Sequence, residues 1–214
     1  MNNYAKITGL FICMMGLLAT GFTTQAVAQS DNGWISLFDG HTLDGWKASE
    51  NPETFSVKEG RIVVDGPRAH LFYQGPVNDH NFRDFEFKAD VMTTEGSNSG
   101  IFFHTQYQEE GWPSKGYEAQ INNSYDKDPR RTASLYGVDD IKETPFPDNE
   151  WFTMHITVEG NRIVIKVDGK TMVDYTEPEN VDRGENVLSS GTFALQGHDP
   201  GSLVYFKNIR VKPL

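Results

Sequence analysis

Short stretches in which apolar and polar residues alternate recur along the chain after residue 50. In the clearest one, residues 83–91, the apolar Phe85, Phe87, Ala89 and Val91 alternate with charged side chains. A period of two with one apolar face predicts a strand that is buried on one side. The same reasoning predicts further strands at Val57, 62–64, 101–107, 117–121, 151–158, 162–167, 171–175, 191–195 and 203–211.

Turn sequences separate these segments. Glu59-Gly60, Gly160-Asn161 and Asp168-Gly169 join neighbouring strands, and Gly, Asn and Asp accept the positive φ that tight hairpins need. Beyond residue 30 no stretch has a helical period, and at most a short helical turn is expected over 178–183. Many short strands at regular turn spacing indicate a sandwich or a barrel. We predict an all-β fold, an antiparallel β-sandwich.

The first residues have a different pattern. A basic start with Lys6, an apolar run over 10–19 and small residues ending at Ala28 predict a secretory signal peptide over 1–28. The apolar run is too short to span a bilayer, so a membrane anchor is a less favoured interpretation than a signal peptide. We therefore expect a secreted, periplasmic protein that consists, after cleavage, of one domain over 29–214 without a membrane span. Cys13 leaves with the signal peptide, so this domain has no disulfide.

Composition narrows the function classes. The net charge is −11 and the acidic residues are spread along the chain, so the surface repels phosphate backbones and nucleic-acid binding is not expected. Aromatic residues make up 12% of the chain, which allows sugar-stacking surfaces. The chain contains neither a Gly-x-Ser-x-Gly nor a His-Glu-x-x-His motif. We expect the long irregular stretch over 122–149 to border the functional face.

The strand over 117–121 offers the best candidate chemistry. If Tyr117, Ala119 and Ile121 face the core, Glu118 and Gln120 line the opposite face of the sheet. A carboxylate on a concave face serves as a general base once its pKa is tuned. The alternative, a solvated strand face without a function, is the more common role of such a pair.

Two histidines are further catalytic candidates. We expect His104 to share a face with Phe102, opposite to Phe103, and His198 follows Gln196-Gly197 at the end of a predicted strand. The imidazole pKa lies near working pH, so both rings suit proton transfer. For a histidine within a strand, a purely structural role is the more common one, and a loop position favours function.

An ordered set of motifs covers nearly the whole mature chain. The motifs are Leu37-Phe38-Asp39-Gly40-His41-Thr42-Leu43-Asp44-Gly45-Trp46, Phe82-Arg83-Asp84-Phe85-Glu86-Phe87, Asn98-Ser99-Gly100-Ile101-Phe102-Phe103, Gly116-Tyr117-Glu118-Ala119-Gln120-Ile121, Leu135-Tyr136-Gly137, Gly160-Asn161-Arg162-Ile163, Asp168-Gly169-Lys170, Leu195-Gln196-Gly197-His198 and Phe206-Lys207-Asn208-Ile209-Arg210-Val211. Each motif is weak alone, but their order is specific. The sequence resembles the 3-keto-disaccharide hydrolase family, formerly a domain of unknown function.

This resemblance implies a jelly roll like that of concanavalin A, as in lectins and glucanases. It also implies cleavage of glycosides already oxidised at C3. A ketone at C3 acidifies the proton on C2, so one base and one enolate stabiliser are enough to expel the group at C1. The sequence places one carboxylate on the candidate strand, at Glu118, which fits this chemistry better than two-carboxylate hydrolysis.

The resemblance also distributes roles over the candidate residues. It implies Glu118 or His198 as the base, and Gln120 and Gln196 as hydrogen-bond partners of sugar hydroxyls. Asn98 and Tyr136 lie in matching motifs, and Arg131 in the long loop is a further substrate-binding candidate. The chain departs from the family at His104, where arginine is expected, and this substitution bears on substrate choice and on catalysis itself.

Other interpretations stay open at this point. A carbohydrate-binding, lectin-like module without chemistry is the main alternative, because one fold serves many functions. A structural or interaction domain of the cell envelope is another. The sequence requires no cofactor, and although it lacks the ligand spacing of an EF-hand, a divalent cation such as calcium held by separate loops is compatible with it. An enzyme of this kind would need a sugar oxidoreductase as its functional partner, to supply the oxidised oligosaccharide or glycoside.

Overall fold

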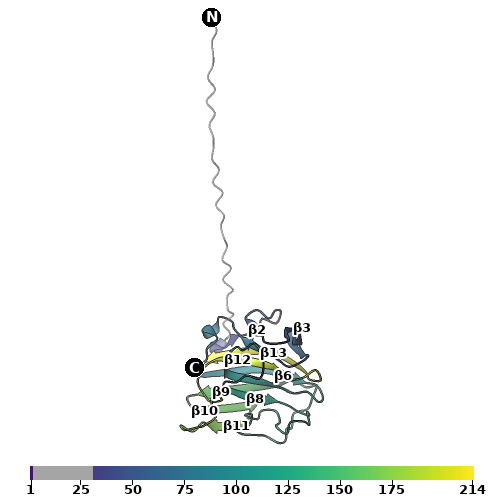
Figure 1. The fold of residues 1–214 in the computed structure, drawn as a ribbon, viewed down its shortest axis with the longest axis vertical. Helices are drawn as coiled ribbons and strands as arrows, with labels where there is room; N and C mark the ends of the chain where they lie inside the picture. Colours follow the sequence, from purple (N-terminus) through teal and green to yellow (C-terminus); the bar gives the residue numbers. More distant parts are fainter. Residues whose placement is uncertain (2–30) are drawn as a thin grey trace.

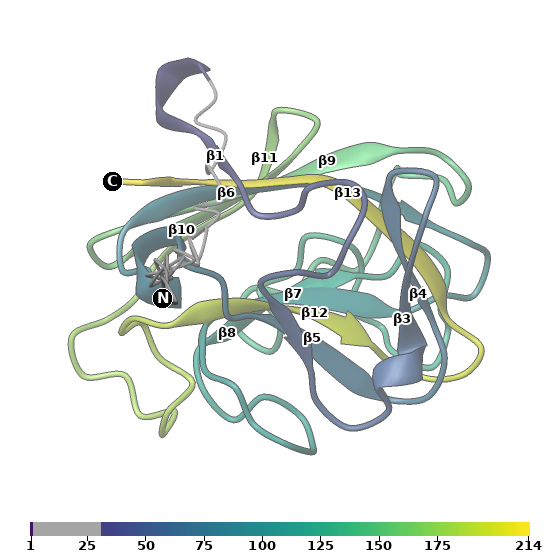
Figure 2. The same ribbon diagram turned by 90° about the horizontal axis from the view of Figure 1, so that it is seen from above.

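Two antiparallel β-sheets lie face to face in the computed structural model, which describes Met1 and residues 31–214 (Figures 1 and 2). The predicted all-β sandwich is confirmed. The predicted signal peptide lies, apart from Met1, outside the described residues. Within the part of the chain that is described, no helix is long and apolar enough to cross a membrane.

The larger sheet has eight strands and contains both hairpins of the C-terminal half. Its order is β11-β10-β9-β6-β13-β4-β3, and β1 pairs with β13. The strands are β1 (Ile35–Ser36), β3 (Phe55–Lys58), β4 (Arg61–Asp65), β6 (Phe85–Thr93), β9 (Phe152–Glu159), β10 (Arg162–Val167), β11 (Lys170–Thr176) and β13 (Leu203–Pro213).

The smaller sheet has five strands in the order β2-β5-β12-β7-β8. They are β2 (Trp46–Ala48), β5 (Ala69–Tyr73), β7 (Ser99–Thr105), β8 (Tyr117–Ile121) and β12 (Thr192–Gly197). Of the three short 3-10 turns described, η1 (Asp31–Gly33) precedes β1, while η2 (Pro52–Thr54) and η3 (Val77–His80) lie between strands. The stretch over 178–183 forms no helix, only a turn in which Val181 N donates to Pro178 O.

The predicted strands are present with ends that differ by a residue or two, but β1, β2 and β5 were not predicted. In β5 all five residues are buried, because the strand lies between β2 and β12 and both of its faces are covered. Such a strand shows no alternation of apolar and polar residues. A pattern with period two therefore could not reveal it.

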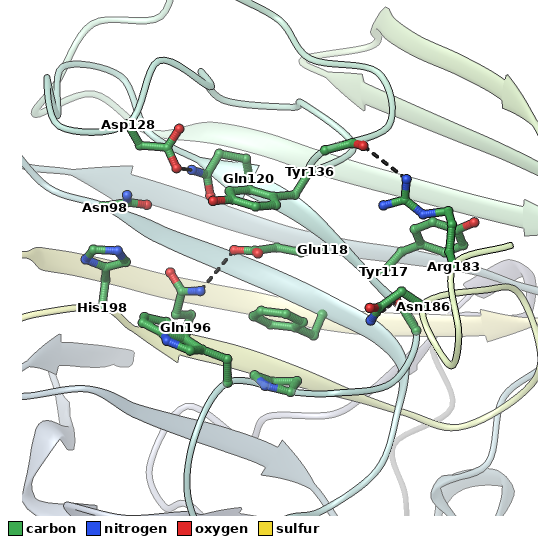
Figure 3. A pocket seen from close by; sticks show the side chains of 15 residues that line it. Asn98, Tyr117, Glu118, Gln120, Asp128, Tyr136, Arg183, Asn186, Gln196 and His198 are labelled. Atoms are coloured by element: carbon green, nitrogen blue, oxygen red, sulfur yellow. Dashed lines mark hydrogen bonds between the residues drawn. The ribbon is translucent and has the colours of Figure 1, made fainter.

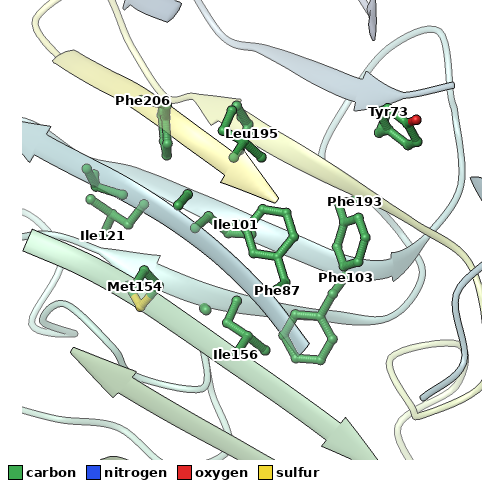
Figure 4. Packing of buried hydrophobic residues seen from close by; sticks show 14 of the residues in the cluster. Tyr73, Phe87, Ile101, Phe103, Ile121, Met154, Ile156, Phe193, Leu195 and Phe206 are labelled. Carbon is green, nitrogen blue, oxygen red and sulfur yellow. The ribbon is translucent and has the colours of Figure 1, made fainter. Parts of the chain in front are cut away.

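Side chains from both sheets form one apolar core between the layers (Figure 4). Phe87 of β6 and Phe193 of β12 pack with their ring centroids 4.6 Å apart, and Phe103 and Ile156 are fully buried beside them. Burial of each such side chain contributes about 1.5–3 kcal/mol, which compensates for the absence of disulfides in the domain.

The same alternation directs a second set of side chains away from the core. Tyr117, Ala119 and Ile121 of β8 belong to the core, so Glu118 and Gln120 lie on the outer face of the smaller sheet, as predicted. A separate small apolar cluster lies on that outer face and consists of Phe72, Phe102, Ala194 and Tyr107. The outer face of the smaller sheet is thus a mixed polar and aromatic surface.

The predicted orientation of His104 is wrong. Thr192 pairs with Thr105 and Phe193 with Phe103, so His104 is an extra residue in β7, a β-bulge with φ +55°. Its ring turns toward the aromatic core and packs against Phe85. The bulge interrupts the alternation that the sequence pattern assumed to continue through β7.

Candidate functional site

A pocket of about 470 Å³ lies over the outer face of the smaller sheet (Figure 3). This volume is in the range of roughly 300–1,000 Å³ that small-molecule sites occupy. It is lined by residues from β7, β8 and β12 and from five connecting segments: Asn98, Phe102, Trp112, Pro113, Gly116, Tyr117, Glu118, Gln120, Asp128, Tyr136, Gly137, Arg183, Asn186, Gln196 and His198. The irregular stretch after β8 borders the pocket, as predicted from its length.

The register of the sheet explains why Glu118 fits into this surface. Glu118 pairs with Phe102 across the strands, and Gln120 pairs with Gly100. Gly100 has no side chain, and the carboxyl of Glu118 occupies the space in front of it. A Cβ added at Gly100 would lie 2.1 Å from Glu118 Oε1. The glycine therefore makes room for the carboxyl group on the floor of the pocket.

Glu118 has an unusual proton affinity. Protein surrounds its carboxyl group, although the residue as a whole is partly exposed to the pocket, and this burial raises its pKa to about 8. The hydrogen bond from Gln196 Nε2, at 3.0 Å, opposes the shift, the charge of Asp128 adds to it, and Arg130 opposes it. At neutral pH the carboxyl is mostly protonated, and its conjugate base is stronger than an ordinary carboxylate.

Three buried amide side chains surround Glu118 with few partners of their own. Asn98, Gln120 and Gln196 are each at most 3% exposed. Within the described residues, neither amide atom of Asn98 has a hydrogen-bond partner, and neither does Gln196 Oε1. Gln120 donates to Asp128 Oδ2 at 3.4 Å or, with its amide turned over, to Glu118 Oε1 at 3.3 Å. Buried polar groups without partners are costly unless a ligand or water satisfies them, so these amides are suited to bind hydroxyl groups.

His198 follows the last residue of β12 and is held by its neighbour. Its Nδ1 lies 2.8 Å from Asp199 Oδ2. Burial would raise the pKa of Asp199, but hydrogen bonds from His198, from the backbone N–H of Gly201 and from Tyr125 outweigh burial and lower it. The contact with Asp199 fixes the orientation of the ring. His198 is therefore an oriented imidazole in the pocket lining.

The segment over 132–136 brings Tyr136 to the pocket by pairing with the edge of the smaller sheet. Ala119 bridges to Leu135, and the backbone N–H of Tyr136 donates to the carbonyl of Glu118 at 3.0 Å. The guanidinium of Arg130 lies 4.4 Å from the ring centre of Tyr136 and 3.4 Å from Asp128 Oδ1. This pairing covers the otherwise free edge of β8 and places a second carboxylate, Asp128, in the pocket wall.

A second loop, over 106–116, carries Trp112 on the other side of the pocket. Glu50 accepts two hydrogen bonds from Arg68 and one from the backbone N–H of Gly111, each at 3.0 Å. The guanidinium of Arg68 lies 5.3 Å from the ring of Trp112. Among the described residues, the large hydrophobic side chains that are exposed are those of Met1, Trp112, Tyr136 and Leu214. The two exposed aromatic side chains therefore both line the pocket, where sugar rings can stack on them.

Six of the eight predicted site residues meet in this pocket: Asn98, Glu118, Gln120, Tyr136, Gln196 and His198. His104 and Arg131 do not line it. His104 Nε2 contacts the carbonyl of Arg83 at 2.7 Å and its Nδ1 accepts from Ser189 N, which ties the ring to neighbouring loops. Arg131 donates to Asn122 and Tyr125 and pairs with Asp126, so it holds its own loop together.

Sequence reasoning missed four polar or aromatic pocket residues on the connecting segments: Trp112, Asp128, Arg183 and Asn186. No periodic pattern marks them, because loops follow none. The long irregular stretch was a signal for Asp128, and the aromatic Trp112 in a polar loop was a signal that was not used. In the described part of the chain, no group of three or more His, Cys, Asp or Glu side chains is placed to hold a metal ion.

Comparison with known protein families decides how this pocket is classified. The pattern of the 3-keto-alpha-glucoside-1,2-lyase-like domain matches residues 33–212. The chain belongs to this family. The match covers nearly all of the described residues, including every residue that lines the pocket.

Individual relatives of this chain agree with the family assignment. A 3-keto-disaccharide hydrolase of Bacteroides thetaiotaomicron is 25% identical, over 86% of this chain and 79% of the relative. A crystal structure from Parabacteroides distasonis, provisionally named a glycosyl hydrolase, superimposes with a TM-score of 0.71 at 22% identity, over 85% of this chain and 94% of its own. The carbohydrate-binding module CBM66 of Bacillus subtilis has a TM-score of 0.56 at 15% identity, over 78% and 95% of the chains. The two structures show a shared fold.

Proposed function

We propose that this protein cleaves the glycosidic bond of 3-keto-glycosides by removing the proton on C2, with Glu118 as the base. The observation that carries the proposal is the carboxyl of Glu118, which lies on the floor of the pocket with its pKa raised by burial to about 8. A base whose pKa lies near the working pH is the most effective general catalyst. The family assignment supports the choice of an oxidised sugar as the substrate.

The proposed reaction has three steps. Glu118 takes the C2 proton, and the electron pair of the C2–H bond forms an enolate whose charge lies on the C3 oxygen. The enolate then restores the ketone and forms the C1–C2 double bond, while the C1–oxygen bond breaks and the leaving oxygen takes a proton. Water finally adds at C1 and a proton returns to C2, so the net reaction is hydrolysis.

The remaining pocket side chains support this sequence of steps. His198, held by Asp199, is the side chain we assign to the enolate oxygen, which is where charge develops. Asn98, Gln120 and Gln196 are assigned to the ring hydroxyls, and Trp112 and Tyr136 to the apolar faces of the sugar. A 3-keto-glycoside forms by oxidation of a glycoside at C3, so an oxidoreductase must act before this protein.

A second candidate function follows from Asp128. Glu118 and Asp128 both line the pocket, and two carboxylates are what ordinary glycoside hydrolysis uses. Asp128, however, accepts hydrogen bonds from the backbone and side chain of Arg130. An enzyme that used the pair would cleave glucosides that are not oxidised.

The test compares a 3-keto-α-glucoside with the same glucoside unoxidised, each with and without a chelator. The proposal predicts turnover of the keto form alone, and a fall in kcat/KM of at least about 100-fold in Glu118→Gln with the fold retained. Cleavage of both forms would favour the carboxylate pair. Binding without turnover of either would make the protein a carbohydrate-binding module, and loss of activity with the chelator would reveal a metal ion.

A further inference from the structure

The pocket has two chemically different ends on either side of Glu118 (Figure 3). Asn98 and Gln196 lie at one end and are almost fully buried. Arg183 and Asn186 lie at the other end with Gly137, where the side chains are partly or fully exposed. The buried amides suit a fixed set of hydroxyls on the reacting sugar. The open end then faces the group that leaves from C1.

Arg183 differs from the other arginines around the pocket. Arg68, Arg130 and Arg131 each have a carboxylate partner, in Glu50, Asp140 and Asp126 respectively. In the described part of the chain, no carboxylate lies within the 4.0 Å limit of an ion pair with Arg183. Its Nη1 donates to the carbonyl of Gly137 at 3.1 Å, and its Nε is buried without a hydrogen-bond partner.

The segment that carries Arg183 is fixed on both sides. Before it, Glu177 accepts hydrogen bonds from the hydroxyl of Tyr117 and, at 2.9 Å, from the backbone N–H of Leu188. After it, Asn186 donates to the carbonyls of Ser114 and Gly116 at 3.3 Å. Glu177 is therefore occupied by other donors and does not neutralise Arg183. The guanidinium is held at the pocket, and no carboxylate of the described residues forms an ion pair with it within 4.0 Å.

We propose that Arg183 binds a carboxylate on the leaving group, so that the preferred substrates are 3-keto-glycosides of an acidic sugar or of another carboxylate-bearing aglycone. The planar guanidinium matches a carboxylate with two parallel hydrogen bonds, which a neutral aglycone cannot form. The acidic surface of the protein does not prevent this, because charges separated by more than about 8–10 Å are screened at physiological ionic strength. This inference rests on the proposed function for the placement of the leaving group.

The test uses a pair of aglycones of equal shape, 4-carboxyphenyl and 4-carbamoylphenyl 3-keto-α-glucoside. A charged hydrogen-bonded contact predicts a kcat/KM about 10- to 100-fold higher for the carboxylate. In Arg183→Gln the ratio of kcat/KM for the carboxylate to kcat/KM for the carbamoyl substrate falls to about one. The kcat/KM for the carbamoyl substrate stays within a few-fold of that of the unaltered protein. Arg162→Gln removes the same charge from β10, where Arg162 pairs with Asp174 on the exposed surface, and keeps the ratio.

Two results would overturn the inference. One is an equal kcat/KM for both aglycones in the unaltered protein. The other is an equal loss for both in Arg183→Gln, which would assign Arg183 to the enolate or to the fold. If neither compound is cleaved, the affinities of the two unoxidised glucosides, measured by calorimetry, test the anion site independently of the reaction. If the protein binds the carboxylate compound more tightly and Arg183→Gln abolishes this preference, the anion site is supported although the proposed function fails. If the protein shows no preference, the anion site is contradicted as well.

Discussion

Glu118 and Gly100 form a unit across two strands, because the carboxyl of one residue fills the space that the other leaves open. Burial raises the pKa of this carboxyl, and a hydrogen bond from Gln196 fixes its direction. The proposed role of Glu118 as a base therefore depends on a missing side chain as much as on those present. Residues that never touch substrate can then be altered to test its role.

Gly100→Ala should disable Glu118 without removing it. The new methyl group would lie 2.1 Å from Oε1, so the carboxyl must move. A displacement of about 1 Å of a reacting group costs about 100-fold in rate, and we expect that loss in kcat/KM with the fold retained. Combined with Glu118→Gln, the alanine should cause no further loss. Additive losses in the double variant would show that Gly100 acts through another group.

The raised pKa of Glu118 predicts the pH dependence of the reaction. The base must be ionised in the free enzyme, so kcat/KM should rise about tenfold per pH unit up to about pH 8 and then level off. Besides burial, the charge of Asp128 contributes to the raised pKa of Glu118. Asp128→Asn should therefore move the rise of kcat/KM to lower pH. A rise of kcat/KM that is centred on the usual pKa range of carboxyl groups, or that Asp128→Asn does not shift, would contradict the assignment of Glu118 as the base.

At the scale of elements, a regular sheet carries the proposed base, and loops supply the aromatic side chains of the pocket rim. The outer face of β8 and β12 carries Glu118 and Gln196, while Trp112 and Tyr136 come from connecting segments. Glu50 and Arg68 tie the Trp112 loop to the sheet edge. This division separates the proposed base from the aromatic side chains assigned to stacking, so the two should respond to different substitutions.

Glu50→Ala should weaken substrate binding and leave the chemical step intact. The change releases Arg68 and the backbone N–H of Gly111, so the loop that carries Trp112 loses its anchor. Because an exposed ion pair is worth about 0–1 kcal/mol, we expect KM to rise about two- to fivefold with kcat nearly unchanged. Asp174→Ala breaks a similar pair on β10 and should change neither constant. A fall in kcat without a change in KM would show that the Trp112 loop affects the chemical step, and would contradict its assignment to substrate binding.

The sequence predicts those parts of the site that follow the sheet. Glu118 and Gln120 could be placed because β8 alternates without interruption between a core face and a polar face. His104 could not, because the bulge in β7 appears only when its pairing with β12 is known. Arg183 reaches the pocket through contacts between segments far apart in the chain, which no local pattern encodes.

At the scale of the molecule, the sandwich has its core between the sheets and its pocket on one outer face. The core needs no contribution from the pocket, so the pocket tolerates buried polar groups without partners that would destabilise an apolar core. The family assignment and the pocket support the same class of reaction. Export through a signal peptide over 1–28 stays a prediction, which the mass of the protein recovered from the periplasm would test.

The most direct test of the account is cleavage of a 3-keto-α-glucoside in D₂O, followed by analysis of the sugar product at early times. Removal of the C2 proton and its later return from solvent predict deuterium at C2 of the released 3-keto-sugar. Incubation of that sugar alone with the protein corrects for background exchange. A product that forms at the same rate but keeps its original hydrogen at C2 would contradict elimination and point to direct displacement at C1.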